Sequence, residues 1–234
     1  MPTEAGLDLH RQIDGYCERT TPEFWAEPIN AITNAAFILA AVTALFAARR
    51  AGRLDGPVLW LVGLMAVIGT GSFLFHTFAT VWAAIADTAP IMLFILSYFT
   101  IAMRVFGGFG WGRSLLLTLG FVGVLIGLSW ILNMVLRDII GGSVSYVPAL
   151  LAIWAVGFWL RTRMHPAGNW LLTVGCIFAV SLTARAIDLP LCSDIAAGTH
   201  WAWHVLNGVV LGTLTMAVIR HGGRSTLDDA RGAF

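Results

Sequence analysis

Apolar stretches of membrane-crossing length limit what this chain can fold into. A helix needs roughly 20 apolar residues to cross the hydrocarbon core of a bilayer, and such stretches follow one another along almost the whole sequence. Only 12% of the residues are charged, against about 25% in a typical soluble domain. We therefore expect an all-α membrane protein, a bundle of seven transmembrane helices. The expected helices are Ile29–Ala48, Pro57–Phe78, Val81–Met103, Ser114–Leu136, Val144–Leu160, Gly168–Ile187 and Gly198–Ile219.

The arginines are divided unevenly between the two sides of such a bundle. Short cytoplasmic loops collect Lys and Arg, so the arginine-rich side is expected to be cytoplasmic. This puts the N-terminus outside the cytoplasm and the C-terminus inside it. The ten arginines on one side are Arg49, Arg50, Arg53, Arg104, Arg113, Arg161, Arg163, Arg220, Arg224 and Arg231, and the four on the other are Arg11, Arg19, Arg137 and Arg185.

This orientation divides the chain into three parts. We expect an extracytoplasmic segment over residues 1–28, a membrane domain over 29–220 and a cytoplasmic tail over 221–234. The net charge of +1 gives no reason to expect nucleic-acid binding. The partners expected are membrane lipids and a lipid substrate, and nothing in the sequence indicates an obligate protein partner.

A few polar side chains lie inside the apolar stretches, all towards the outer side. Ionisable groups in a membrane span are costly and usually functional. His200 and His204 are four residues apart, as are Ser72 and His76, and this spacing puts each pair on one helix face. Asp87 lies at a similar depth in the third stretch. Three neutral imidazoles with an open fourth position are typical of a catalytic zinc site, so we predict that His76, His200 and His204 bind Zn²⁺.

Simpler interpretations of the same residues stay open at this point. A single buried histidine is often a hydrogen-bonded packing residue, and Ser72 can serve helix packing alone. Asp87 can be a carboxylate hydrogen-bonded to local backbone. Arg185 and Asp188, three residues apart, are interpreted as a structural ion pair. The alternative function is a non-hydrolytic receptor or transporter with a structural metal. A haem site is excluded for the pair on the last helix, because two histidines on one face cannot be opposite axial ligands.

The polar set predicts hydrolysis of a lipid amide. Zinc polarises a carbonyl and lowers the pKa of bound water towards about 7. Asp87 is then expected to accept a proton from water and pass it to the departing amine, while Ser72 donates a hydrogen bond to the developing oxyanion. Tyr146 and Trp203 are expected near the lipid head group. The active site should face the extracytoplasmic side, which is a periplasm or an organelle lumen.

Several short motifs occur in a fixed order from about residue 14 to residue 220. They are Tyr16–Glu18, Ala26–Asn30, Thr33–Asn34, Gly69–His76, Asp87–Pro90 and His200–His204. In these residues the chain resembles the alkaline ceramidase family, which belongs to a wider group of seven-helix zinc-dependent membrane hydrolases that includes the adiponectin-type receptors.

The resemblance implies a function and a set of ligands. It implies cleavage of ceramide to a sphingoid base and a fatty acid, with zinc on the three histidines and with Ser72 and Asp87 at the zinc-bound water. It also implies a disulfide between Cys17 and Cys192.

Family members can in addition bind Ca²⁺ through an N-terminal acidic loop. Glu18, Glu27 and Asn30 match that pattern. Asp14 is shifted by one residue relative to that pattern, and the loop before Glu27 is shorter, so the match to the calcium site is partial. Glu27 and Asn30 could instead orient the zinc site from behind its ligands.

Overall fold

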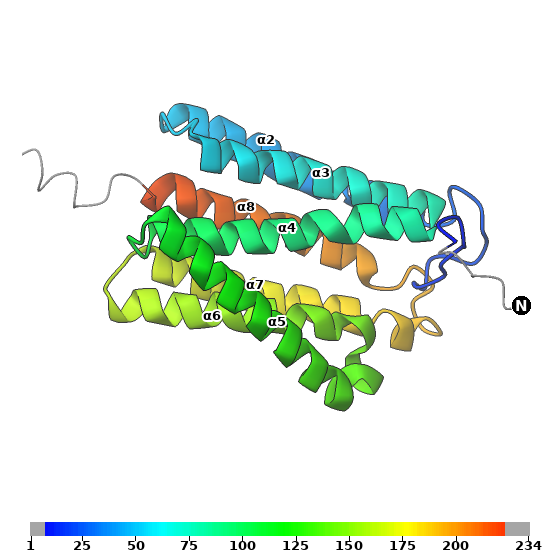
Figure 1. The fold of residues 1–234 in the computed structure, drawn as a ribbon. Helices are drawn as coiled ribbons and strands as arrows, with labels where there is room; N and C mark the ends of the chain where they lie inside the picture. Colours follow the sequence, from blue (N-terminus) through cyan, green and yellow to red (C-terminus); the bar gives the residue numbers. More distant parts are fainter. Residues whose placement is uncertain (1–7, 223–234) are drawn as a thin grey trace, which may run out of the picture.

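The apolar stretches form long helices that run between the two ends of the molecule (Figure 1). The computed structural model describes residues 8–222. Within that range the chain is all-α, as the sequence predicts, and it forms no strand beyond one isolated bridge between Gln12 and Thr80. In chain order the elements are α1 (Pro28–Thr33), α2 (Ala35–Arg50), α3 (Gly56–Phe78), α4 (Val81–Val105), α5 (Trp111–Ile140), the 3₁₀ helix η1 (Gly141–Tyr146), α6 (Val147–Thr162), α7 (Ala167–Ala186), the 3₁₀ helix η2 (Leu189–Leu191) and α8 (His200–His221).

By length and apolarity, six segments of residues 8–222 are candidate membrane spans, one fewer than the sequence predicts. The difference lies in one 52-residue candidate, Trp111–Thr162. It contains α5, η1 and α6, whereas the sequence predicts two helices there. The chain departs from α5 at Gly141, where φ is +54°, a conformation that glycine adopts without strain. Figure 1 draws α5 and α6 as separate rods on either side of this point.

The predicted boundaries differ from the observed ones by a few residues. The first predicted helix is divided at Asn34, which lies between α1 and α2, and the two together form one candidate span, Pro28–Arg50. Pro28, placed in the N-terminal segment by the sequence, begins α1, and His221, placed in the tail, ends α8. Residues 223–234 of the predicted tail lie outside the described residues.

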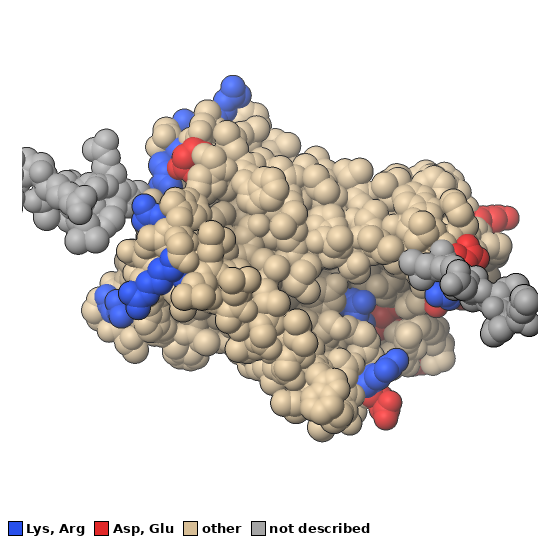
Figure 2. All heavy atoms as spheres, viewed as in Figure 1, with Lys and Arg blue, Asp and Glu red and all other residues tan. Residues whose placement is uncertain are grey.

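The two ends of the bundle differ in charge. Figure 2 shows basic side chains gathered at the end where α2 joins α3 and where α8 finishes. We call this the arginine-rich end. The described arginines of the connections at this end are Arg49, Arg50, Arg53, Arg104, Arg113, Arg161, Arg163 and Arg220. The opposite end carries the N-terminal segment, the α3–α4 turn, η1 and the α7–α8 connection, and we call it the site end.

Glycines allow two pairs of helices to pack closely near the site end. A Cβ on Gly71 of α3 would lie 2.1 Å from the backbone oxygen of Ala86 on α4, so only glycine permits this crossing. A Cβ on Gly208 of α8 would lie 3.0 Å from three atoms of Ala36 on α2. Small residues of this kind let membrane helices pack backbone to backbone. The first approach brings the start of α4 against α3, and the second brings the start of α2 against α8.

The N-terminal segment is fastened across the site end. The backbone N–H of Ile13 donates to the carbonyl of Ala79, 2.7 Å away, in the α3–α4 turn. Four residues later, Cys17 forms a disulfide with Cys192 in the α7–α8 connection, which confirms the pairing that the family resemblance implies. The segment thus joins elements that are 175 residues apart in the sequence.

Candidate metal centre

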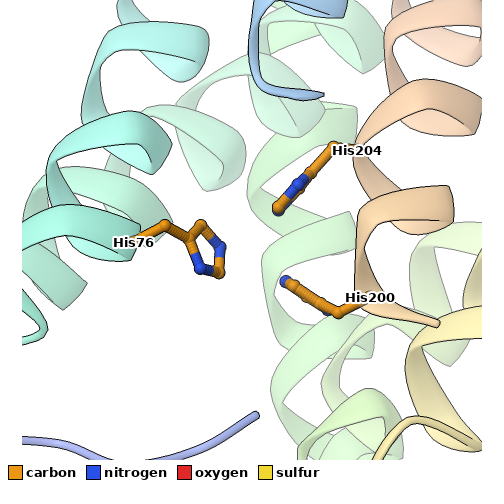
Figure 3. Close-up of side chains that lie close together, drawn as sticks. All are labelled: His76, His200 and His204. Atoms are coloured by element: carbon orange, nitrogen blue, oxygen red, sulfur yellow. The ribbon is translucent and has the colours of Figure 1, made fainter. Parts of the chain in front are cut away.

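Three histidines meet between α3 and α8 at the site end. His76, near the end of α3, points towards His200 and His204 in the first two turns of α8 (Figure 3). One ligand nitrogen from each ring lies within 4.8 Å of the others. All three side chains are buried, with relative exposures of 0%, 2% and 1% in that order. Among residues 8–222, this is the one group of three or more His, Cys, Asp or Glu side chains arranged so that it could hold a metal ion.

The hydrogen bonds of two rings leave one nitrogen of each available as a ligand. Nδ1 of His76 lies 2.6 Å from Oε2 of Glu27, and Nδ1 of His204 lies 3.0 Å from Oγ1 of Thr33. The Thr33 hydroxyl donates to the backbone oxygen of Ile29, so it accepts from His204. These contacts place the proton on Nδ1 in both rings and direct the lone pair of Nε2 inwards.

The ring atoms that face one another have no protein partner. Nε2 of His76, Nδ1 of His200 and Nε2 of His204 are all buried and unpartnered. A buried polar atom without a hydrogen bond costs about 1–3 kcal/mol, and three such atoms converge here. A cation that accepts nitrogen ligands would satisfy all three, so the side chains present fit a bound metal.

Glu27 is held in place from three sides. Its carboxylate accepts hydrogen bonds from Nε of Arg19 and Nδ2 of Asn30, in addition to its contact with His76. Burial alone would raise the pKa of Glu27, but the contacts with His76, Arg19 and Asn30 outweigh burial and lower it. The side chain is therefore an anion, and it fixes the orientation of His76.

His200 is positioned through the backbone of α8. The carboxylate of Asp188 accepts from the N–H groups of Thr199 and His200, at 2.6 and 2.9 Å, and from that of Cys17 at 3.1 Å. Gly198, with φ at +61°, leaves room for this contact, because a Cβ there would lie 2.1 Å from Oδ1 of Asp188. Asp188 therefore caps α8 and sets the direction in which His200 points.

The interpretation of Arg185 and Asp188 as an ion pair is wrong. No salt bridge joins them. Asp188 is occupied by three backbone N–H groups, which satisfy its charge without Arg185. Arg185 instead donates to Ser143 of η1 and to Tyr16.

Two residues at the site have no role in the sequence-based prediction. The ring of Tyr16 stacks on that of His200, with centroids 3.7 Å apart and planes 20° apart, and Thr33 orients His204. Burial raises the pKa of Tyr16 above its ordinary value, against the opposing effect of Arg185, so the hydroxyl stays protonated at neutral pH. Both residues belong to the short motifs quoted above, but nothing in their local pattern indicates contact with a histidine.

Ser72 and Asp87 lie together beside the histidines. Gly71 brings α3 against Ala86 and Asp87 of α4, which makes Ser72 a neighbour of the Asp87 carboxyl group. Oδ1 of Asp87 is buried and has no hydrogen-bond partner. Ser72 is four residues before His76, so on α3 both side chains share one face. A water molecule between the histidines and Asp87 could donate a hydrogen bond to this unpaired oxygen.

An apolar cavity begins beside this group and extends into the bundle. It is partly open to the outside, and Ser72, Tyr146 and Trp203 line it together with apolar side chains of α4, α6, α7 and α8. On α8 the lining runs from Trp203 to Leu214, which is about 16 Å at about 1.5 Å per residue. The cavity suits a hydrocarbon chain whose polar end stays near Ser72.

The residues expected for calcium are placed differently from one another. Both carboxylate oxygens of Glu18 accept backbone N–H groups at the start of α1, from Ile29 at 2.7 Å and from Asn30 at 2.8 Å. Glu27 is occupied by Arg19 and His76. Asp14 is exposed. The carboxylates of Glu18 and Glu27 are thus directed to protein donors.

A comparison with known families gives one match over nearly the whole chain. The family model described as Ceramidase matches residues 13–230. No curated protein matches the sequence.

Proposed function

Because this chain belongs to the ceramidase family, we propose that it hydrolyses the amide bond of ceramide, releasing a sphingoid base and a free fatty acid. Family membership implies a hydrolase that acts on an amide bond. The observation that carries the proposal is the convergence of three buried, unpartnered histidine nitrogens beside the apolar cavity. A reactive centre next to an apolar cavity is what cleavage of an acyl lipid requires.

We propose zinc as the metal, held by His76, His200 and His204. Three imidazole nitrogens and an open position are the ligand set of a catalytic zinc site. When bound, zinc would supply a polarised carbonyl oxygen and a water molecule of lowered pKa. Glu27 and Thr33 would support zinc binding through their contacts with His76 and His204. Hydrogen bonds to the second nitrogen of a ligand histidine fix its tautomer and leave Nε2 free for the metal.

In the proposed reaction Asp87 moves the proton. Its unpartnered Oδ1 accepts a proton from the attacking water and delivers it to the amide nitrogen, so that the amine leaves in a protonated form. The oxygen of the water forms the new bond to the acyl carbon as the carbon–nitrogen bond breaks. Ser72, beside Asp87, donates a hydrogen bond to the carbonyl oxygen as negative charge develops on it.

The cavity accounts for the lipid part of the proposed substrate. Its apolar lining would take the acyl chain, with the amide near Ser72. Tyr146 and Trp203 line the same cavity, and their rings lie 5.0 Å apart. We propose that they contact the head-group portion of the lipid.

We also propose seven membrane crossings, with α5 and α6 each crossing once. Under the positive-inside rule the arginine-rich end is cytoplasmic, so the site end and the N-terminus face the opposite side. The disulfide at the site end supports this orientation, since such bonds persist in oxidising compartments. The catalytic centre would then open towards a periplasm or an organelle lumen.

The experiment that tests this function combines metal analysis with release of fatty acid from a fluorescent ceramide. We expect near one zinc per chain with hydrolysis in the unmodified protein, and loss of both in His204→Ala. Asp87→Asn should keep the metal and lose turnover, while His10→Ala, at an exposed position, should behave like the unmodified protein. Bound zinc without hydrolysis of any lipid amide or ester would favour the receptor-like alternative, and full activity of Asp87→Asn would refute the proton-transfer role.

A further inference from the structure

Arg185 carries a positive charge at the site end that the proposed reaction does not use. It lies at the end of α7, where Nη1 donates to Oγ of Ser143 at 3.0 Å and Nη2 donates to the hydroxyl of Tyr16 at 3.3 Å. Its guanidinium also faces the rings of Tyr16, Tyr146 and Trp203, with distances from Cζ to the ring centroids of 6.0, 5.4 and 5.6 Å.

No carboxylate among residues 8–222 forms a salt bridge with this guanidinium. Arginine stays charged in proteins and has five N–H donors, and two hydroxyl oxygens account for two of them. A charged group within a candidate membrane span is costly and is normally kept for a partner or a substrate. Three aromatic rings face the guanidinium and the Asp87 carboxyl group is near enough to interact with its charge, but neither the ring faces nor that carboxyl group accepts a hydrogen bond from it. Its remaining N–H donors therefore have no protein acceptor among residues 8–222.

The surroundings of Arg185 place it beside the polar end of the cavity. Tyr16, which accepts its hydrogen bond, stacks on His200. Tyr146 and Trp203, which it faces, line the cavity together with Ser72. A substrate with its acyl chain in the apolar cavity and its amide at the histidines would therefore direct its other half, the amine portion, towards the guanidinium.

We propose that Arg185 binds an anionic group of the lipid, and that the preferred substrates include N-acyl amides with a carboxylate on the amine portion, such as N-acyl amino acids. The proposal rests on the proposed function for the location of the scissile amide. A guanidinium stacks on aromatic faces, and its planar fork of donors matches the two oxygens of a carboxylate. The carboxylate of the released fatty acid could also bind this guanidinium. The experiments below distinguish a substrate carboxylate from the product carboxylate.

The first experiment compares two substrates that differ in one group. N-palmitoylserine carries a carboxylate where N-palmitoylserinol carries a neutral hydroxymethyl group. We expect kcat/KM to be higher for the acid by about 10- to 100-fold, the range for a hydrogen-bonded charge. In Arg185→Gln, which keeps a donor for Tyr16 or Ser143, the ratio should fall towards one.

A second pair of variants separates charge from structure. A Cβ on Gly142 would lie 3.7 Å from Nη1 and 3.8 Å from Nη2 of Arg185, within ordinary contact. Gly142→Asp places a competing carboxylate beside the guanidinium and should remove the preference for the acid while Arg185 is retained. Gly142→Asn, of the same shape without the charge, should leave the preference in place.

A binding measurement tests the proposed anion site without requiring that the protein hydrolyse an amide. Binding of N-palmitoylserine and of palmitate is measured by equilibrium dialysis against the purified protein and against Arg185→Gln. Weaker binding of N-palmitoylserine in the variant supports the proposal even if no amide is hydrolysed and the proposed function fails. A variant that changes only palmitate binding, and product inhibition with it, supports an anion site that serves the product. Unchanged binding of both probes, together with an unchanged substrate ratio, overturns the proposal.

Discussion

Oε2 of Glu27 lies 2.6 Å from Nδ1 of His76, in a position that is nearly closed to solvent. The carboxylate holds the ring so that Nε2 faces the other two histidines. Groups of this kind behind a metal ligand typically change metal affinity by about 10- to 100-fold when they are altered. We therefore expect Glu27→Gln to weaken metal binding by about that factor, because the amide keeps the shape and loses the charge.

The measurement for Glu27→Gln is competition for zinc with a chelator of known affinity. Glu23→Gln, at an exposed position a few residues earlier, is the matched control and should bind zinc like the unmodified protein. Equal zinc affinity in both variants would mean that the contact with His76 does not influence the metal.

Arg19 forms a buried ion pair with Glu27, with side-chain exposures of 3% and 2%. Its guanidinium also donates to backbone oxygens of Thr21, Glu23 and His76. Removing one partner of a buried pair costs about 3–5 kcal/mol, so Arg19→Met should lower the unfolding temperature strongly. Arg53→Met breaks the more exposed pair with Asp55 and should cost about 1 kcal/mol or less. Thermal unfolding in detergent compares the two variants, and similar losses would contradict the expectation.

The hydrogen bonds of Glu27 and Glu18 also lead to a prediction about calcium binding. The positive charge of Arg19 already neutralises Glu27, and Glu18 is directed to the start of α1. We expect a calcium-selective chelator to leave both the hydrolysis rate and the unfolding temperature unchanged. Activity that disappears with the chelator and returns on addition of Ca²⁺ would show instead that the N-terminal carboxylates rearrange around an ion.

Gly71 offers a test of how α3 and α4 place Ser72 beside Asp87. In Gly71→Ala the new methyl group would lie 2.1 Å from the backbone oxygen of Ala86, so the two helices must separate. We expect loss of hydrolysis and a lower unfolding temperature. Gly63→Ala is the control, because a Cβ at that α3 position meets nothing within 4 Å. It should be neutral or stabilising by up to about 1 kcal/mol, since alanine favours a helix over glycine. Normal activity in Gly71→Ala would show that the crossing tolerates a wider spacing.

The disulfide connects the segment that carries Tyr16 to the connection that precedes α8. Cys17→Ser and Cys192→Ser should each lower stability by about 2–5 kcal/mol, the usual cost of losing a native disulfide. Cys176→Ser, at an exposed free cysteine, should change little. The measurement is thermal unfolding with and without reductant. A reductant effect that persists in Cys17→Ser would place the sensitive bond elsewhere.

The helices and the grouping of the three histidines could be predicted from the sequence, because both follow from simple physical constraints. Long apolar stretches have few alternatives in a bilayer, where every backbone group must be satisfied within a helix. The spacing of His200 and His204 fixes them on one face whatever surrounds them. Their meeting with His76 was predicted only from a common depth in the membrane, and the three rings do converge.

The parts that sequence reasoning missed depend on contacts between distant segments. Asp188 looked like a partner for Arg185 because the two are close in sequence, but it lies instead against the backbone at the start of α8. Tyr16 reaches His200 only because the N-terminal segment crosses the site end. The helix from 111 to 140 is longer than predicted at both ends, since its apolar pattern gave no sharp boundary. The partners of Asp188 and Tyr16 depend on segments distant in the sequence, so no local sequence pattern could have predicted them.

The order in which the chain is synthesised gives the arrangement of the metal centre a further consequence. One candidate ligand lies on α3 and the other two lie on α8, which is synthesised more than 120 residues later. A nascent chain that has inserted α2 to α7 but not α8 holds one of the three converging imidazoles and cannot assemble the candidate centre. If the proposed function holds, a chain terminated before residue 200 is an inert membrane protein, and the growing polypeptide exposes no hydrolytic activity to the translocation machinery or to the surrounding lipid.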